Sequence, residues 1–528
     1  MKRALLSVTD KTGIVDFAKG LVRAGYSILS TGGTRRALTD AGVEATEVAD
    51  YTGFPEMMDG RIKTLHPRVH GGLLARRDLV AHGEAMRTHG IDPIDLLCVN
   101  LYRFREATQR PDAARDDIVE NIDIGGPAML RSAAKNHASV TVVVDPADYA
   151  AVLAALPGGD EAAGRALRRR LAAKAFAHTA AYDAAIAQWF DAERRELPDE
   201  PYFAPRAAFA GELLQTLRYG ENPHQRAAFY SAGGAGPSLA GATQLAGKEL
   251  SYNNILDADA ALACALDFDP GAFACVLVKH NNPCGVAVAP TLTRAFELAL
   301  ASDPVSAFGG ILATNRTFDA ATAAAVVASG TFLEVVVAPS IEPGALAELE
   351  KAKWGASVRV LDLGGSPTAA ARCEPVFRPV SGGFLLQTPD QPDGPPEQRV
   401  ACARAPTAVE SATLAFAWQV GKHVKSNAIV LARATDDGAH CTVGVGAGQM
   451  SRVDAAKIAV DKAGDRARGT VVASDAFFPF PDGLQVCAAA GATAAIQPGG
   501  SKRDDEVVAV ANEHGMAMVM TGRRHFRH

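Results

Sequence analysis

Apolar runs and helical patterns alternate along the first third of the chain. Residues 4–8 and 26–30 have the short apolar character of buried strands, and between them apolar side chains recur at helical spacing in residues 12–24. A further apolar run at residues 96–99 predicts another strand. A strand, a helix and a second strand in this order predict a β-α-β unit, so we expect the α/β fold class.

Another apolar run, at residues 276–278, ends in two ionisable side chains, Lys279 and His280. The residues that follow them are turn formers, namely Asn281, Asn282, Pro283 and Gly285. We therefore expect Lys279 and His280 at the carboxyl end of a buried strand, which is the edge where ligands bind in open α/β sheets. Lysine offers a fixed positive charge to an oxyanion, and histidine exchanges protons near neutral pH. A surface pair leaving a strand is the open alternative.

The composition limits what kind of protein this is. A chain of 528 residues that is 48% hydrophobic can form a large core, and its length suggests about three or four domains. The net charge of −6 provides no general attraction to nucleic acid or to an anionic membrane. No apolar run is long enough to cross a membrane, so we expect a cytoplasmic protein. The cysteines form no C-x-x-C pair, which argues against a zinc ribbon, and we predict no metal site.

Loops that follow the predicted strands of the first third carry groups that bind anions. Residues 31–34 (TGGT) join a strand to a helix and can direct backbone N–H groups and hydroxyls toward a phosphate. Residues 61–77 are rich in Lys, Arg and His and contain no acid. Asp123 precedes a second Gly-Gly pair, and Lys135 lies on the helix expected after it, so these two can line one pocket. A plain strand-to-helix turn and a solvated basic loop are the open alternatives.

A set of motifs occurs in order within residues 7–137: SVTDKTG, STGGT, GRIKTLHP, NLY and IDIGGPAMLRSAAKNH. In these motifs the chain resembles the inosinate cyclohydrolase domain, which has a methylglyoxal-synthase-like α/β fold. The resemblance implies ring closure, in which a carboxamide nitrogen attacks a neighbouring formyl carbon and water is lost. It implies a site for the nucleotide phosphate and nearby groups at Ser7, Thr9, Lys11, Thr31, Gly33 and Thr34.

The same resemblance implies a second group of side chains around the reacting end of the nucleotide. They are Arg61, Lys63, Tyr102, Asp123 and Lys135. Lys63 and Lys135 would stabilise charge, and Tyr102 and Asp123 would transfer protons. Because both reacting groups belong to one molecule, the protein would mainly hold them in attack geometry and neutralise the oxyanion.

The sequence changes character near Pro198. Alanine-rich helical sequence at residues 160–189 gives way to a proline-rich stretch, so we place the first domain at residues 1–198. Beyond it, VKHNNPCGVAVA is echoed by VKSNAIVLA, and SDPVSAFGG is echoed by SDAFFPFPDG. The echoes predict two related α/β lobes, at residues 199–390 and 391–528. Chance similarity is the open alternative, because the echoes are short.

Further motifs cover most of residues 203–528: LRYGENPHQ, KELSYNNILDADAA, KHNNPCG, SDPVSAFGG, KSNAIV, GVGAGQMSRVD, SDAFFPFPDG and RHFRH. Together they resemble the formyltransferase domain that acts on 5-aminoimidazole-4-carboxamide ribonucleotide, whose two lobes are of the cytidine deaminase type. The resemblance implies that Lys279, His280 and Asn427 are catalytic. It implies nucleotide binding by Arg218, Tyr219, Asn427 and Arg452. The residues implied around the folate and the nucleotide are Phe477, Asp482, Phe526 and His528.

With both halves in place, the chain resembles the bifunctional enzymes that perform the last two steps of IMP synthesis. The attacking 5-amino group is a poor nucleophile, so His280 would act as a base while Lys279 stabilises the oxyanion. The resemblance implies 10-formyltetrahydrofolate as co-substrate, no tightly bound cofactor, and a homodimer. A requirement for a monovalent cation such as K⁺ is left open.

Two other functions are compatible with parts of the sequence. A zinc-dependent nucleotide deaminase needs H-x-E and P-C-x-x-C motifs, and Pro283-Cys284 has no second cysteine at that spacing. The first domain could also be a regulatory anion-binding module attached to a formyltransferase. The set of Lys63, Tyr102, Asp123 and Lys135 favours a catalytic domain over that alternative.

Overall fold

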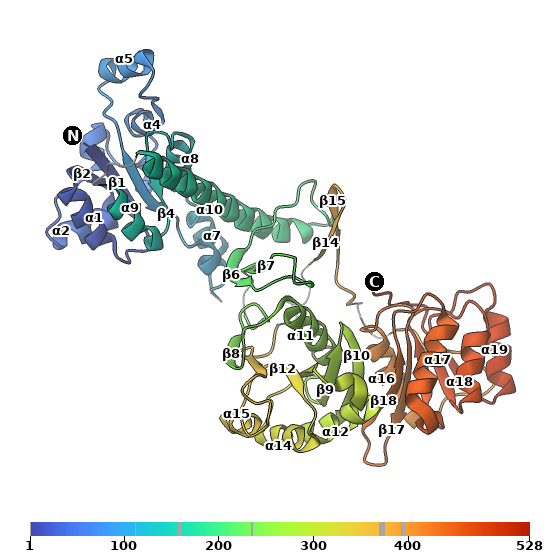
Figure 1. Cartoon of the computed structure of the whole chain (residues 1–528). Coiled ribbons are helices and arrows are strands. Elements are labelled where there is room, and N and C mark those ends of the chain that lie inside the picture. Colours follow the sequence, from blue (N-terminus) through green and yellow to red (C-terminus); the bar gives the residue numbers. More distant parts are fainter. Residues whose placement is uncertain are drawn as a thin grey trace. The chain divides into compact units, whose positions relative to one another are not determined.

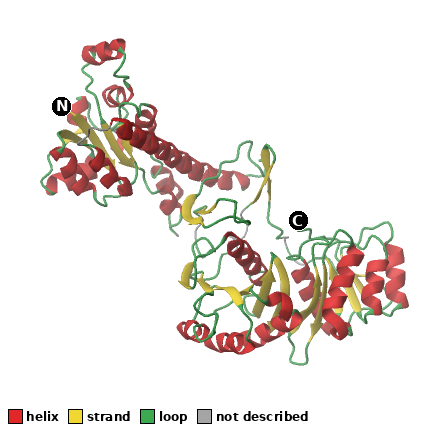
Figure 2. Cartoon of the chain, in the orientation of Figure 1, coloured by secondary structure: helices red, strands yellow, loops and turns green. Residues whose placement is uncertain are grey.

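The computed structural model describes residues 2–110, 112–156, 161–233, 236–368, 375–391, 394 and 396–528 (Figure 1). The chain divides into two compact units, Met1–Glu212 and Leu213–His528. Each unit combines strands and helices (Figure 2), which confirms the predicted α/β fold class. Within the described residues, no helix is long and apolar enough to cross a membrane. The domain limits at residues 198 and 390 stay predictions.

The first unit is built on a five-stranded sheet in which all neighbouring strands are parallel. The strand order is β3 (Thr46–Glu47), β2 (Tyr26–Ser30), β1 (Lys2–Val8), β4 (Leu96–Asn100) and β5 (Thr141–Val143). The α-helices are α1 (Ile14–Arg23), α2 (Gly32–Asp40), α3 (Val48–Thr52), α4 (Pro67–Leu74), α5 (Val80–Thr88), α6 (Phe104–Thr108), α7 (Arg115–Glu120), α8 (Gly125–Lys135), α9 (Tyr149–Ala155) and α10 (Glu161–Arg195). The strands predicted from residues 4–8, 26–30 and 96–99 are thus confirmed.

Burial on both faces of the strands explains this layered arrangement. Leu5 in the central strand β1 and Leu97 in its neighbour β4 have no exposed surface, as expected of a parallel sheet covered by helices. Helix α1 buries Phe17 and Leu21 at the predicted helical spacing. Because the strands are parallel, the loops after β1, β2 and β4 share one edge of the sheet. That edge is where the sequence places the anion-binding motifs.

The second unit contains a twelve-stranded sheet. Its order is β16 (Arg399–Val400), β21 (Ala517–Met520), β20 (Ala494–Gln497), β19 (Val471–Ser474), β17 (Ile429–Ala434), β18 (His440–Gly446), β10 (Asn282–Ala289), β9 (Phe273–Lys279), β11 (Gly310–Thr314), β12 (Leu333–Ala338), β13 (Arg359–Asp362) and β8 (Thr243–Ala246). Two-stranded sheets are formed by β6 (Glu212–Leu217) with β7 (Ala227–Ser231) and by β14 (Val376–Val380) with β15 (Gly383–Gln387). The α-helices are α11 (Tyr252–Ala265), α12 (Leu292–Ser302), α13 (Pro304–Ala307), α14 (Ala320–Ser329), α15 (Pro343–Leu349), α16 (Ala408–Gly421), α17 (Arg452–Ala463), α18 (Asp482–Ala489) and α19 (Asp504–Glu513).

The two halves of this sheet repeat one topology. In each half a helix leads into an antiparallel hairpin, a second helix, and then three parallel strands separated by helices. The hairpins are β9–β10 and β17–β18. Strand β10 pairs antiparallel with β18 at the centre, where Ala287 lies opposite Cys441, so an approximate two-fold rotation relates the halves. This repeat confirms the predicted pair of related α/β lobes.

The two-fold relation shows that the repeated sequence motifs do not occupy equivalent positions in the two lobes. The rotation reverses strand direction, so the counterpart of the β9–β10 turn is the β17–β18 turn at residues 435–439, on the opposite edge of the sheet. The VKSN motif instead precedes β17, and the motif alignment is therefore wrong as a structural alignment. The two motifs nevertheless share one edge, where the backbone N–H of Lys425 donates to Oδ1 of Asn282 at 3.0 Å.

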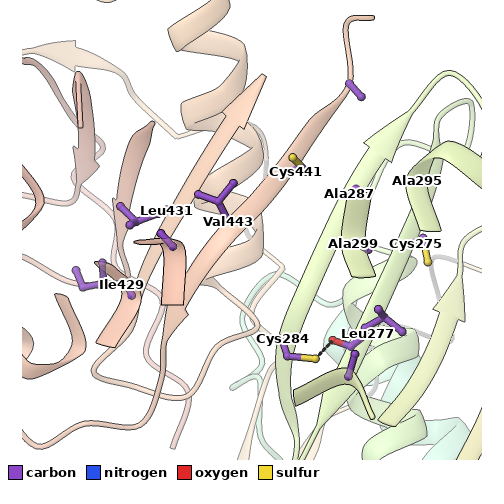
Figure 3. Close-up of a cluster of buried hydrophobic side chains, with 14 of the residues drawn as sticks. Cys275, Leu277, Cys284, Ala287, Ala295, Ala299, Ile429, Leu431, Cys441 and Val443 are labelled. Carbon is purple, nitrogen blue, oxygen red and sulfur yellow. Dashed lines mark hydrogen bonds between the residues drawn. The ribbon is translucent and has the colours of Figure 1, made fainter. Parts of the chain in front are cut away.

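Glycines allow helices to pack directly on the two central strands. A Cβ atom at Gly285 in β10 would lie 1.9 Å from the carbonyl oxygen of Ala299 in α12. In the other lobe, a Cβ atom at Gly446 in β18 would lie 1.9 Å from the carbonyl oxygen of Ala455 in α17. Side chains of both lobes form one buried cluster around this junction (Figure 3), including Cys275, Leu277, Ala287, Leu431, Cys441 and Val443.

The change Gly285→Ala should destabilise the second unit, because its new methyl group meets backbone rather than a movable side chain. We expect a loss of about 1–3 kcal/mol in the free energy of unfolding, the usual cost of overpacking. Denaturant-induced unfolding of the variant and of the unsubstituted chain measures this loss. Gly421→Ala at the end of α16 is the matched control, since a Cβ atom there meets no atom within 4 Å. Equal midpoints for the two variants would contradict the packing argument.

Candidate active sites

The first unit has a cavity of about 680 Å³ at the carboxyl ends of β1, β2 and β4. Its lining includes most of the side chains that the sequence predicts for ring closure: Ser7, Thr9, Lys11, Thr31, Gly33, Thr34, Arg61, Lys63, Tyr102 and Asp123. These residues come from loops far apart in the sequence. The loops after β1, β2 and β4 meet at one edge of the parallel sheet, and the loops that precede α4 and α8 bring Lys63 and Asp123 to the same cavity.

One wall of this cavity is a cradle of hydroxyls and lysines around the start of α2. The hydroxyls of Ser7 and Thr31 are 2.9 Å apart. The hydroxyl of Thr34 donates to the carbonyl of Val8 at 3.0 Å and so ties α2 to β1. Gly32 has φ +41, and a Cβ atom on it would lie 3.1 Å from Nζ of Lys63. The glycine pair therefore lets an ammonium group approach the positive end of a helix, an arrangement suited to a phosphate.

Two acids that the sequence analysis did not single out pair with the basic side chains of this cavity. Nζ of Lys63 lies 3.2 Å from a carboxylate oxygen of Glu56. Arg61 forms an ion pair with Glu120. Both acids line the cavity. Their pairing depends on chain folding, and neither acid stands in a motif that would have indicated it.

Asp123 and Tyr102 form another part of the cavity lining. A carboxylate oxygen of Asp123 accepts from the backbone N–H of Gly126 at 2.8 Å, and its own N–H donates to the hydroxyl of Tyr182 at 2.8 Å. Burial raises the pKa of Asp123, and the N–H groups of Gly126 and Tyr102 oppose that shift. Burial and the nearby Asp123 charge raise the pKa of Tyr102, so its phenol is a proton donor at neutral pH.

Lys135 does not join this group. It is the exposed last residue of α8, whereas the cavity contacts the first turn of that helix at Gly125 and Gly126. A helix rises about 1.5 Å per residue, so the length of α8 separates Lys135 from Asp123. The expectation that these two side chains line one pocket within the chain is therefore wrong.

In the second unit, Lys279 and His280 stand at the turn between β9 and β10. Lys279 pairs with Asn282, and the two residues between them, His280 and Asn281, have φ +51 and φ +60. Positive φ at both central residues is the geometry of a tight type I′ hairpin turn. Asn282, Pro283 and Gly285 begin β10 instead of forming the expected turn, and a bulge at Pro283 and Gly285 accommodates them.

This turn presents its two ionisable side chains differently. Nζ of Lys279 donates to the carbonyl of Gly309 at 2.7 Å, which joins the KHNNPCG and SDPVSAFGG motifs. His280 is exposed. A histidine held at positive φ carries a small backbone strain, and such strain often marks a functional position.

Asn427 lies at the same edge of the sheet in a cavity of about 290 Å³. The lining is Ser426, Asn427, Gly448, Gln449, Met450, Phe526 and His528, so three of the predicted residues, Asn427, Phe526 and His528, meet here. The amide nitrogen of Asn427 donates to the carbonyl of Gln449 at 2.8 Å. The Asn427 side chain is thus held against the loop between β18 and α17.

Arg452 stands behind Asn427 rather than in this lining. Its guanidinium is buried and donates to Oδ1 of Asn427 at 2.7 Å and to the hydroxyl of Ser474 at 2.8 Å. It also forms an ion pair with the fully buried carboxylate of Asp475. A buried guanidinium with these partners fixes the orientation of the Asn427 amide.

The other predicted residues of the second unit lie outside the lining of the 290 Å³ cavity. Phe477 and Asp482 belong to the loop after β19 and the start of α18, and Ser474 at the end of β19 pairs with Ile429 of β17. That pairing puts the loop on the same edge as Asn427. Arg218 stacks on Tyr219 at 4.9 Å, directly after β6.

Comparison with known proteins extends these observations to the whole chain. The profile of the AICARFT/IMPCHase bienzyme family matches residues 133–462, and an MGS-like domain profile matches residues 13–128. A bifunctional purine biosynthesis protein PurH of Parvibaculum lavamentivorans is 55% identical over 100% of this chain and 97% of that protein. The protein of the same description from Brucella abortus is 54% identical with the same coverage. The chain belongs to the AICARFT/IMPCHase bienzyme family.

Members of this family combine an AICAR formyltransferase with an IMP cyclohydrolase, and this chain is therefore a bifunctional enzyme of purine biosynthesis. The matched MGS-like domain confirms the predicted methylglyoxal-synthase-like fold of the first unit. A solved structure titled "Crystal structure of ForH" is 41% identical over 36% of this chain and 98% of that chain, with a TM-score of 0.33. The predicted pairing of the two activities is confirmed, and the deaminase and regulatory alternatives are not supported.

Proposed function

We propose that the 680 Å³ cavity is where the formylated nucleotide closes to IMP, and that the sheet edge bearing Lys279, His280 and Asn427 is where formyl transfer occurs. The observation that carries the first assignment is the convergence of Lys63, Tyr102 and Asp123 on one cavity. The second assignment rests on Lys279 and His280 lying at the edge that also bears Asn427.

For ring closure, the cradle formed by Ser7, Lys11, Thr31, Gly33 and Thr34 would hold the nucleotide phosphate. Ionised Asp123 accepts a proton from the carboxamide nitrogen as that nitrogen attacks the formyl carbon. Lys63 stabilises the oxyanion, and the phenol of Tyr102 protonates it. The resulting hydroxyl leaves as water with the proton that Asp123 took up, while the former 5-amino nitrogen gives its proton to the tyrosinate. Arg61 and Thr9 complete the site around the nucleotide. Holding both reacting groups in attack geometry accounts for much of the rate.

For formyl transfer, 10-formyltetrahydrofolate would supply the one-carbon group to the 5-amino nitrogen of the aminoimidazole nucleotide. His280 removes a proton from the amino group at the moment of attack. Lys279 stabilises the tetrahedral oxyanion and helps the departing folate nitrogen gain a proton, while Asn427 steadies the imidazole or the formyl oxygen. Arg218 and Tyr219 serve nucleotide binding, which Arg452 supports by orienting the Asn427 amide. Phe477, Asp482, Phe526 and His528 surround the folate and the nucleotide.

A homodimer completes this proposal. The cavity that contains Asn427 is lined without Lys279 or His280, so a second copy of the chain that approaches this edge would close the site. Lys135, remote from the cavity of its own chain, is available in the same way to a second copy. A cytoplasmic location and a requirement for a monovalent cation such as K⁺ stay predictions.

Paired lysine variants test the assignment of the two sites. We expect Lys63→Met to lose cyclohydrolase activity by roughly two orders of magnitude or more and to keep formyl transfer, because it removes a charge at one oxyanion only. Lys279→Met should give the reverse. The assay follows tetrahydrofolate release and IMP formation separately. Loss of both activities in either variant would contradict two independent sites.

A further inference from the structure

Residues 526–528, which contribute to the lining of the 290 Å³ cavity, are connected to the junction of the two lobes by a series of polar side-chain contacts. Phe526 and His528 line the cavity, and Arg527 lies between them. The side chain of Arg527 reaches His423, with Nη1 at 3.3 Å from Nδ1 of the imidazole. Alternate side chains of this segment therefore serve the cavity and the interior, as alternation along an extended chain allows.

His423 joins Arg527 to a carboxylate of the other lobe. It is buried, and its Nε2 lies 3.1 Å from Oδ2 of Asp267, which also pairs with Lys422 at 3.0 Å. Asp267 follows α11, whereas Lys422 and His423 follow α16. The chain of contacts from Asp267 through His423 to Arg527 thus spans both lobes.

The chemistry of the partners fixes the proton on this imidazole. A guanidinium has only N–H donors, so Nδ1 of His423 must accept from Arg527. The carboxylate of Asp267 only accepts when ionised, so Nε2 of His423 must donate. Burial lowers the pKa of His423, and contact with His423 and Lys422 lowers the pKa of Asp267 to about 2. A neutral imidazole with its proton on Nε2 satisfies both partners at once.

The backbone of Arg527 is fixed beside the catalytic amide. Its carbonyl accepts from the backbone N–H of Ser426 at 2.9 Å, one residue before Asn427. The neighbouring His525 is also anchored, because its N–H donates to the carbonyl of Asp475 at 2.9 Å and its imidazole lies 2.7 Å from a carboxylate oxygen of Asp390. The contacts on either side leave Phe526 and His528 with defined positions in the cavity wall.

We propose that Arg527 is a positioning residue of the formyltransferase site, held through His423 by Asp267 so that Phe526 and His528 form one wall of the substrate cavity. Arg527 itself does not touch the reacting atoms. This inference rests on the proposed assignment of that cavity to formyl transfer. The contact positions side chains that bind the substrate. Its loss therefore weakens binding of the substrate and of the transition state equally, which raises KM and changes kcat much less.

The test uses the full chain and compares formyl transfer with ring closure in the same preparation. Arg527→Met should raise the formyltransferase KM for the nucleotide or the folate roughly tenfold or more, as expected when a charge-assisted contact is lost, with kcat changed much less. Cyclohydrolase kinetics should not change. Arg527→Lys keeps a cation and one donor for His423, so it should recover part of the loss. Arg433→Met, at an exposed position of β17, is the matched control.

Each other outcome has a defined meaning. A KM within twofold of the Arg433→Met control, or a fall in kcat alone, overturns the positioning role. If Arg527→Met fails to fold, Arg527→Gln decides the question, because it also removes the cation and a KM within twofold of the Arg433→Met control would overturn the role. Asn427→Ala separates this inference from the site assignment. If Asn427→Ala leaves formyl transfer intact, the cavity assignment is wrong, whereas an effect at Asn427 with none at Arg527 defeats only the positioning role.

Discussion

His280→Asn should lower formyl transfer by roughly two to four orders of magnitude, the usual contribution of a general base, without lowering the stability of the second unit. Asparagine cannot take up the proton of the attacking amine. It does, however, tolerate the left-handed conformation that this turn imposes, where φ is +51. Stability and activity should therefore separate at this position. Thermal unfolding and a tetrahydrofolate release assay measure the two quantities.

The matched control is His514→Asn, at an exposed position just after α19. We expect it to leave both activities and the unfolding temperature unchanged. Ring closure by His280→Asn, supplied with the formylated nucleotide, should equal that of the unsubstituted chain. Near-normal formyl transfer by His280→Asn would remove this residue from the mechanism.

Asp123→Asn should lower ring closure by roughly two to four orders of magnitude, because the neutral amide cannot accept the carboxamide proton. The amide oxygen can still accept from the N–H of Gly126, which lies 2.8 Å from the carboxylate in the unsubstituted chain. The start of α8 should therefore keep its structure. Assays of IMP formation from the formylated nucleotide measure the loss, and Asp40→Asn, exposed at the end of α2, is the matched control.

The raised pKa of Asp123 adds a pH dependence to this prediction. Burial favours the protonated form in the folded chain, so this group's contribution to stability is fully present below its unfolded pKa and is lost as pH rises through the higher folded pKa. At neutral pH, Asp123→Asn should thus unfold at the same or a higher temperature. Ring closure should rise with pH through the Asp123 pKa in the unsubstituted chain, and that limb should be absent from the variant.

Local patterns were sufficient to predict strands β1, β2, β4 and β9 and the edge of the sheet that bears the first site. The apolar runs at residues 26–30 and 96–99 coincide with β2 and β4, because a parallel sheet buries both faces of its strands. Glycine pairs marked the starts of α2 and α8. Since every loop after a parallel strand reaches the same edge, the strands also predicted that the loops bearing Thr31 and Tyr102 would converge. Lys11 and Lys63 were predicted from the family resemblance, and the loops before α4 and α8 bring Lys63 and Asp123 to the cavity.

Contacts between residues far apart in the sequence could not be predicted from local patterns. Lys135 stands in the same motif as Asp123, but a helix of several turns carries it away from the cavity. The repeated Lys and Asn motifs share an edge without being equivalent, because a rotation that reverses strand direction relates the lobes. Glu56, Glu120 and the His423 to Arg527 contact depend on side chains that only the fold brings together.

A mixing experiment tests the central claim, that two independent sites on one chain perform consecutive steps. His280→Asn and Asp123→Asn are supplied with the aminoimidazole nucleotide and 10-formyltetrahydrofolate, first separately and then together. We expect no IMP beyond trace amounts from either variant alone, tetrahydrofolate release by Asp123→Asn, and IMP formation when the two are mixed. IMP formation by either variant alone at the rate of the unsubstituted chain, or a mixture that stays inactive, would contradict the account.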